Sequence, residues 1–295
     1  MSQLQKRNFF HKILTPPFLI KVISFLLILL IFLEVFPTNF FKRLNFQILL
    51  FLLEMDARGI NPLPMSLIDR EDVWEFMVKK ESGMYKRKNA EIILARHPAL
   101  EPRMRAMLLD WLNEVCEGLL LLRDSFSLAV DLIDRFLGVS PSVPTDKLQL
   151  IGITCLFIGT KIEEVSPPKL QELSSTTDGV CSEEDIIQME ARVLEGLKWC
   201  VSPMTANSWM MFYMQINHGS KRPMDESFSL PDFPGFSFSL AMQLVDLSMM
   251  DMGSLEFSYS ILATSAFYHT ESEDVALKVS GIQLSTLKQI LRQTY

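Results

Sequence analysis

Glu163 and Glu164 are two adjacent carboxylates of the kind that general acid–base catalysis uses. Neighbouring residues of a helix point in different directions, so these two carboxylates would not converge on one substrate atom. The four histidines are scattered without catalytic partners: His11, His97, His218 and His269. The sequence also has no phosphate-binding glycine loop, no GxSxG motif and no HExxH motif. We therefore expect a protein that is not an enzyme and has no catalytic residues.

The cysteines do not form a metal-binding pattern. They are Cys116, Cys155, Cys181 and Cys200. None of them has CxxC spacing, and no histidine lies at the distance that a zinc finger requires. Most lie in or beside an apolar run, which favours free thiols in a reducing compartment. We expect no metal and no cofactor.

The charge is distributed unevenly between the two ends of the chain. Residues 1–53 carry six Lys/Arg and one acidic residue, out of totals of 28 and 35. The remaining residues, 54–295, therefore hold 22 basic and 34 acidic side chains, a net charge of −12. Such an acidic body repels phosphates, and it has no stripe of Lys/Arg with interleaved aromatic residues. We expect no direct contact with nucleic acid.

The amino-terminal segment, residues 1–60, differs in kind from the rest of the chain. Residues 22–33 form an uncharged apolar run, VISFLLILLIFL, preceded by four Lys/Arg. This run is shorter than the roughly 20 residues of a full membrane span. Three interpretations stay open: a membrane anchor, a cleaved signal or amphipathic tail, and a gene-model artefact in which non-coding sequence is translated. Binding to a membrane through residues 22–33 is thus uncertain.

The rest of the sequence is predicted to be all-α, because apolar residues recur at helical spacing and no period-2 strand pattern occurs. Residues 61–100 form a helix and lead-in, with the helix running up to residue 85. Residues 101–202 form a first bundle of five helices, predicted at 102–122, 124–137, 148–162, 170–173 and 182–197. Residues 203–295 form a second bundle, predicted at 205–217, 238–250, 255–268, 274–278 and 283–293. Two interpretations of the second bundle stay open, a complete one and a truncated one, since its last predicted helix ends close to the end of the chain.

Several short motifs resemble those of the cyclin family, and in particular of E-type cyclins. Residues 104–112, MRAMLLDWL, are similar to the MRAIL-x-DWL signature, although Met107 stands where cyclins usually have Ile. Further motifs follow in the order and spacing of the family: KLQLIG at 147–152, KIEE at 161–164, PPKL at 167–170, TDGVCS at 177–182 and LKW at 197–199. The resemblance covers roughly residues 62–295. It implies two cyclin-box five-helix bundles in tandem.

The resemblance also implies a surface that binds a kinase. In cyclins, a Lys and a Glu at the positions of Lys161 and Glu190 contact the PSTAIRE helix of a cyclin-dependent kinase. Both residues lie at helix positions that can emerge at one rim of a bundle. The candidate kinase-binding residues are Lys161, Ile162, Glu163, Glu190, Leu194 and Val201. Ile162 departs from the Phe or Leu that cyclins usually have there.

A second candidate surface follows the apolar stripe of residues 104–112. If this stripe is not covered internally, it forms a shallow apolar groove with a polar rim, a pattern that marks partner sites. In cyclins the matching groove binds RxL-type peptides of substrates and inhibitors. The candidate groove residues are Met104, Met107, Leu108, Trp111, Glu114 and Gln149.

Taken together, the resemblance implies a regulatory subunit that activates a cyclin-dependent serine/threonine kinase at the G1/S transition, in the nucleus and cytoplasm. Two alternatives remain: a transcription-type cyclin-box protein, and a membrane-anchored helical scaffold without a kinase partner. A membrane location would follow if the apolar amino-terminal segment is real.

Overall fold

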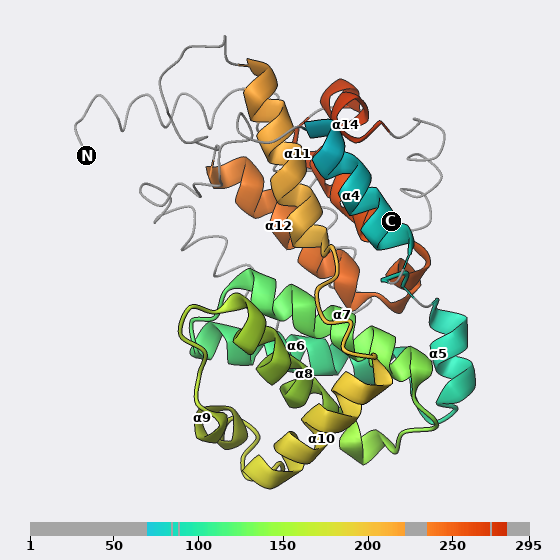
Figure 1. Cartoon of the computed structure of the whole chain (residues 1–295), viewed down its shortest axis with the longest axis vertical. Coiled ribbons are helices and arrows are strands. Elements are labelled where there is room, and N and C mark those ends of the chain that lie inside the picture. The colour runs from blue at the N-terminus through green and yellow to red at the C-terminus, as the bar shows by residue number, and fades with distance from the viewer. Residues whose placement is uncertain (1–69, 84, 88, 222–234, 272, 282–295) are drawn as a thin grey trace, which may run out of the picture. The chain divides into compact units, whose positions relative to one another are not determined.

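The computed structural model of the chain describes residues 70–83, 85–87, 89–221, 235–271 and 273–281. All of them belong to one of its two compact units, Gly59–Thr294. Every regular element of this described part is a helix, which confirms the predicted all-α class (Figure 1). The elements are α4 (Arg70–Ser82), α5 (Ala90–Arg96), α6 (Pro102–Gly118), α7 (Arg123–Val139), η2 (Thr145–Lys147), α8 (Leu148–Glu163), α9 (Leu170–Ser175), α10 (Glu183–Gly196), α11 (Ala206–Lys221), α12 (Gly235–Met250), η3 (Met252–Glu256), α13 (Tyr259–Thr270) and α14 (Glu273–Ser280).

The first bundle consists of α6 to α10 and is arranged around α8, which packs against each of the other four helices (Figure 1). The sequence of α8 is apolar on nearly all sides, and Ile151 and Leu156 are fully buried. Gly159 permits the close approach of α7: a Cβ atom at this position would lie only 2.8 Å from the carbonyl oxygen of Ser125. A hydrophobic helix with glycine at its tightest contact therefore forms the core of this bundle.

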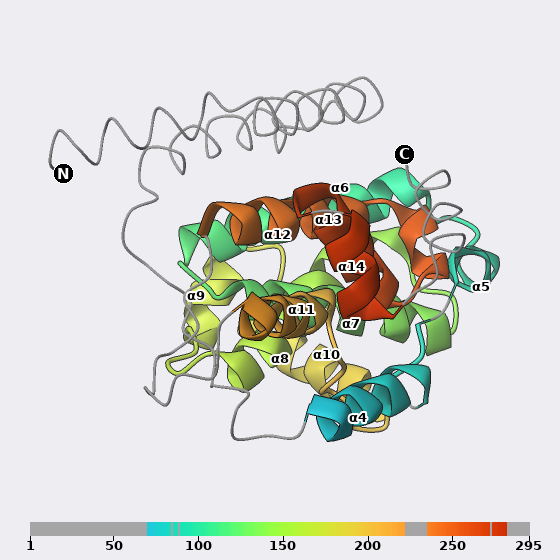
Figure 2. The ribbon, with the colours of Figure 1, turned by 90° about the horizontal axis from the view of Figure 1, so that it is seen from above.

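The second bundle is arranged around α13, which packs against α11, α12 and α14. Its predicted fifth helix, at 283–293, lies outside the described residues. Figure 2 shows α12, α13 and α14 of this bundle together at the top of the view. Helix α4 precedes the first bundle in sequence, but its Trp74 contacts aromatic rings of α11 in the second. The indole ring of Trp74 is 5.5 Å from that of Trp209 and 5.9 Å from the ring of Phe212, between ring centroids. Edge-on and tilted ring contacts of this kind fix α4 to the second bundle.

Two local predictions differ from the structure. The continuous helix predicted at 255–268 is wrong: η3 ends at Glu256, and α13 begins only at Tyr259. The backbone is extended at Phe257, where η3 ends. The carbonyl oxygens of Ser254 and Phe257 accept hydrogen bonds from Nη1 of Arg87, at 2.9 and 3.0 Å, so the guanidinium binds the chain at this interruption. The short helix α5 was not predicted. Its amino end is capped by Asn89, whose side chain accepts a hydrogen bond from the backbone of Ile92.

Buried arginines connect the two bundles. Arg105 of α6 is 1% exposed and forms a bidentate ion pair with Asp134 of α7, at 2.7 and 2.8 Å. Its Nη1 also donates to the carbonyl oxygen of Met249, at 2.8 Å, near the carboxyl end of α12. A cation is favoured at this end of a helix because the last carbonyl groups have no intrahelical partners. A cation of the first bundle thus caps the carboxyl end of α12 in the second.

Arg123 at the start of α7 forms another connection, an ion pair with Asp246 of α12. Burial raises the pKa of Asp246 to about 6, although Arg123 opposes this shift. Because its pKa is higher in the folded than in the unfolded chain, folding favours the protonated form. The stability that this proton contributes is present at low pH and is lost as pH rises through about 6.

We therefore expect Asp246→Asn to remove a pH dependence of stability. Between about pH 5 and about pH 7 the free energy of unfolding of the wild type should fall by about 1 kcal/mol relative to that of the variant. Urea denaturation at several pH values measures this difference. Parallel pH profiles for the two proteins would contradict the expectation.

Among the residues that the structure describes between 70 and 281, no helix is long and apolar enough to span a bilayer. The apolar run at 22–33 lies outside the described residues.

Candidate functional site

The charged pair that the sequence singled out is brought together at one rim of the first bundle. Lys161, in the last turn of α8, forms an ion pair with Glu190 of α10. The ammonium group of Lys161 also lies 4.0 Å from the ring centroid of Phe157, one turn earlier on α8. The Lys161 side chain is 40% exposed and that of Glu190 16%. The pair is therefore positioned by its own helices, yet it remains accessible to a partner.

Ile162 and Leu194, two apolar candidate residues, lie on the same two helices as this ion pair. Ile162 is 41% exposed, and Leu194, one turn beyond Glu190 on α10, is half-buried. Glu163 is exposed, and its pKa is raised by partial loss of hydration and by the carboxylates of Asp124 and Glu164. Val201 is half-buried in the connection between α10 and α11.

Trp199 belongs to the same region and was not among the predicted site residues. It is 71% exposed, and the backbone of Lys198 and Trp199 is left-handed, with φ of 51° and 60°. Its backbone N–H donates to the carbonyl oxygen of Leu194, at 2.9 Å, which closes the turn after α10. Left-handed backbone is unusual for bulky residues. Here it presents a large aromatic ring to solvent. We call Lys161, Ile162, Glu163, Glu190, Leu194 and Trp199 the Lys161 face.

The second candidate surface lies on α6 and the start of α8. Met107 is 54% exposed, whereas Leu108 is buried. A Cβ atom on Gly152 would lie 2.8 Å from Cδ1 of Leu108, so α6 and α8 touch at this point. Leu108 is therefore held between the two helices, whereas Met107 is the most exposed of the apolar candidate residues. Half-buried side chains make up the rest of the groove: Met104, Trp111, Glu114 and Gln149.

The residues of the signature run at 104–112 thus lie on two sides of α6, one toward the candidate groove and one buried. The residues Met104, Met107 and Trp111 recur at helical spacing toward the groove. Arg105 and Leu109 point to the other side and are almost completely buried. The arginine of this run is consequently a structural residue that joins the bundles, not part of the groove.

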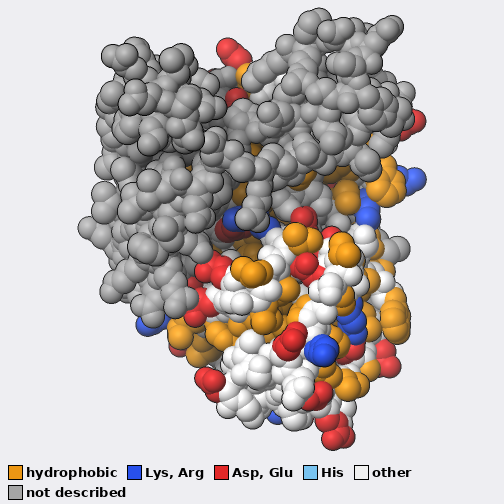
Figure 3. Space-filling view, turned by 90° about the vertical axis from the view of Figure 1, so that its left-hand side faces the viewer, with side chains coloured by type: hydrophobic (Ala, Val, Ile, Leu, Met, Phe, Trp, Pro, Cys, Tyr) orange, Lys and Arg blue, Asp and Glu red, His pale blue; other side chains and the backbone are white. Residues whose placement is uncertain are grey.

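Exposure of an apolar side chain does not by itself identify either surface. Figure 3 shows one face of the molecule, on which hydrophobic side chains of the described part lie between acidic and basic ones. Leu120 and Val165 are more exposed than any candidate residue, at 90% and 102%. The Lys161 face is distinguished by its charged pair, and the groove by its polar rim.

The described residues contain no cluster of three or more His, Cys, Asp or Glu that could hold a metal ion. Burial raises the pKa of the Cys116 thiol to about 12. Burial likewise raises the pKa of Cys155 and Cys181. These three cysteines are therefore protonated and unreactive at neutral pH.

Two protein families match the chain. The family described as "Cyclin, N-terminal domain" matches residues 72–202, and the one described as "Cyclin, C-terminal domain" matches residues 204–294. The chain therefore belongs to the cyclin family. This confirms the family resemblance and the tandem arrangement of two cyclin boxes.

Individual relatives are described as G1/S-specific cyclins of the E type, which agrees with the predicted subfamily. The chain is 42% identical to "G1/S-specific cyclin-E" of Drosophila melanogaster over 245 residues, 78% of this chain and 34% of that protein. It is 40% identical to "G1/S-specific cyclin-E1" of Gallus gallus over 235 residues, 79% of this chain and 56% of that protein. The chain spans about a third to about half the length of these relatives.

A solved structure shares the fold. It is the X-ray structure of a viral cyclin from herpesvirus saimiri, with a TM-score of 0.56 and 20% sequence identity. The similarity covers 76% of this chain and 92% of the viral chain. At this level of identity it supports the architecture of the two bundles and nothing further.

Proposed function

We propose that this cyclin binds a cyclin-dependent serine/threonine kinase through the Lys161 face and activates it without being an enzyme itself. The observation that carries the proposal is the accessible Lys161–Glu190 ion pair, with Ile162 exposed next to Lys161 in the sequence and Trp199 exposed in the turn after α10. Tryptophan is enriched among residues that dominate binding energies, and an adjacent charge pair fixes orientation and partner choice.

The proposed mechanism is a shift of the kinase between two conformations. An active kinase needs a helix glutamate paired with the lysine that positions ATP. A rigid partner surface that binds this helix in its inward position raises the population of the active state. The Lys161 face suits this role because its charged residues lie on helices α8 and α10, which are packed in one bundle.

We extend the proposal to the G1/S transition because the relatives described above carry that designation. We also propose that the protein acts in the nucleus and cytoplasm. A membrane location through residues 22–33 is the competing outcome. Fractionation of cells that express the full chain, or a chain without residues 1–53, distinguishes the two locations.

The kinase proposal is tested by adding the full chain to purified cell-cycle and transcription-associated cyclin-dependent kinases. We expect a stable complex with a cell-cycle kinase, and phosphorylation of a short peptide only when the chain is present. Activation of a transcription-associated kinase alone would favour the transcription-type alternative. Absence of binding to every kinase would favour the scaffold.

We further propose that the groove recruits substrates and inhibitors that carry RxL-type motifs. The exposure of Met107 on α6 supports this, as does Glu114 on the same helix, whose carboxylate suits an arginine of the motif. Recruitment raises the local concentration of substrate near the kinase. This proposal predicts that changes in the groove weaken substrate docking without affecting kinase binding, and that changes in the Lys161 face have the opposite effect.

We expect Met104→Ala combined with Met107→Ala to lower kcat/KM for an RxL-bearing substrate by about ten-fold or more, since each methionine contributes about 1.5 to 3 kcal/mol when fully buried. A short substrate without the motif should be phosphorylated at the wild-type rate. Both rates are measured on one kinase complex, after thermal melting has shown that the variant is folded. An equal loss on both substrates by a folded variant would contradict the groove assignment.

A further inference from the structure

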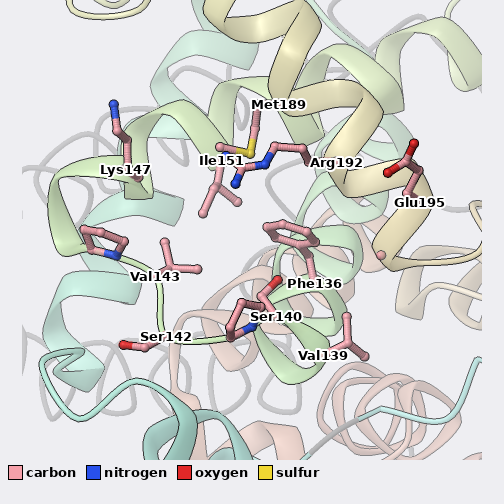
Figure 4. Close-up of a pocket in the computed structure, with 13 residues that line it drawn as sticks. Phe136, Val139, Ser140, Ser142, Val143, Lys147, Ile151, Met189, Arg192 and Glu195 are labelled. Carbon is pink, nitrogen blue, oxygen red and sulfur yellow. The ribbon is translucent and has the colours of Figure 1, made fainter.

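A pocket of about 400 Å³ lies on the first bundle, and none of its lining residues belongs to the Lys161 face or to the candidate groove. Its floor is apolar and consists of Phe136 of α7, Ile151 of α8 and Met189 of α10 (Figure 4). The segment 140–144, with Pro141 and Pro144, forms one wall. Three exposed charged side chains lie around it: Lys147, Arg192 and Glu195. The pocket is thus accessible along its charged edge.

The wall of this pocket is held in place by His97, which is 2% exposed. Nδ1 of His97 accepts a hydrogen bond from the N–H of Val143, at 3.0 Å, and Nε2 lies 2.8 Å from the carbonyl oxygen of Leu137. The two bonds therefore define a neutral ring with its proton on Nε2. A pocket whose wall is fixed in advance loses little conformational entropy when it binds a ligand.

The charge in this pocket differs from that of the body around it. Arg192 extends from α10 across the pocket toward Ile151 and Met189, whereas the charged ends of Lys147 and Glu195 point away (Figure 4). Arg192 forms no ion pair with any described residue. It lies in a region of the chain, 54–295, with a net charge of −12. An unpaired guanidinium above an apolar floor suits a ligand that combines a carboxylate with an apolar group.

The pocket is separate from both surfaces described above. Arg192 follows Glu190 by two residues, which places it about 200° around α10, on the opposite side from the ion pair. Ile151 likewise follows the groove residue Gln149 by two residues on α8, so the two side chains also point to opposite sides of that helix. A ligand in the pocket would therefore leave the Lys161 face and the groove free.

We propose that this pocket binds an extended peptide segment of a third protein, in which an apolar side chain stands close to an acidic one. The apolar side chain fills the space above Phe136, Ile151 and Met189, and the carboxylate pairs with Arg192. A volume of about 400 Å³ is near the lower end for ligand sites, so it holds a few side chains of a segment that crosses the surface. This surface would let the cyclin hold a partner while kinase and substrate are both bound.

The test uses the full chain and a panel of fluorescein-labelled short peptides built from Gly and Ser. Each peptide carries one Leu and one Asp, adjacent or separated by up to about three residues, which spans the reach of neighbouring side chains along an extended segment. Matched peptides carry Asn for Asp or Ser for Leu. We expect saturable binding by at least one Leu–Asp peptide, weakened about ten-fold or more by either change in the peptide.

Two protein variants assign the binding to the pocket. Arg192→Glu should weaken it about ten-fold or more, and Arg192→Lys should weaken it less, because a lysine keeps the charge without the planar fork. Lys278→Glu makes the same change of charge at an exposed position of α14 and should leave binding unchanged. Binding of a cyclin-dependent kinase should be the same in all three variants.

The proposal is overturned if no peptide of the panel binds with a dissociation constant below about 1 mM. It is also overturned if Arg192→Glu and Lys278→Glu have equal effects, which would indicate non-specific attraction. Binding of free acetate or succinate as tight as that of the peptide would show a small-anion site instead.

Discussion

Replacing Arg105 by leucine is expected to lower the free energy of unfolding by about 3 to 5 kcal/mol, which is what breaking a buried ion pair costs. The change leaves Asp134 buried without its bidentate partner and removes the hydrogen bond to the carbonyl oxygen of Met249. Proteins of this size have total stabilities of about 5 to 15 kcal/mol. The loss is therefore a large fraction of the total stability of the protein.

Arg103→Leu is the matched control, since Arg103 lies two residues earlier on α6 and is exposed. It should change the free energy of unfolding by less than about 0.5 kcal/mol. Chemical denaturation measures both variants. The double variant Arg105→Leu with Asp134→Leu should recover part of the loss, because the carboxylate that Arg105 leaves buried is removed as well. Arg87, which lies 3.8 Å from Asp134, keeps its hydrogen bonds to the carbonyl groups of Ser254 and Phe257. Equal stabilities of Arg105→Leu and Arg103→Leu would contradict the structural role of Arg105.

Exchanging the charges of Lys161 and Glu190 is expected to abolish kinase binding without unfolding the protein. In the variant Lys161→Glu with Glu190→Lys, the two residues can still pair with each other, so the free energy of unfolding should change by less than about 1 kcal/mol. The partner, however, meets opposite charges at both positions. Because like charges at an interface cost several kcal/mol, affinity should fall by about 100-fold or more.

Isothermal titration with the purified kinase measures this loss, and thermal melting checks the fold. The control exchanges charges at Asp274 and Lys278 of α14, both exposed in the second bundle. Its affinity should match that of the wild type. Trp199→Ala provides an independent reading of the same face and should weaken binding by about 30-fold, as expected for a central aromatic residue. Wild-type affinity in the charge-exchanged variant would show that the kinase binds elsewhere.

Much of the fold could be predicted from local sequence patterns. The helical spacing of apolar residues and the breaks at proline and glycine located α6 to α10 to within a few residues. The proximity of Lys161 and Glu190 was also expected. Each stands on a strongly patterned helix, and both helices had to pack in one bundle. Pattern and packing thus agree in this part of the chain.

Features that depend on distant contacts could not be predicted in this way. At the break between η3 and α13, Arg87, about 170 residues earlier, binds the carbonyl groups of Ser254 and Phe257. The exposure of Trp199 depends on a left-handed turn that usually requires glycine. The hydrogen bond from Arg105 to the carbonyl oxygen of Met249 in the second bundle likewise joins residues far apart in the sequence. In each case the local sequence favours an ordinary helix or core position, and tertiary structure decides otherwise.

The arginine contacts across the two boxes also bear on modularity. Arg105 and Arg87, from the first half of the chain, satisfy the carbonyl groups of Met249, Ser254 and Phe257 in the second half. Either half expressed alone would keep one set of these groups without its partners. Two bundles of similar architecture suggest that each box could be exchanged on its own. Because these hydrogen bonds join them, we expect the two boxes to unfold as one cooperative unit. Excising or exchanging either box would then require new partners for the arginines and carbonyl groups at their boundary.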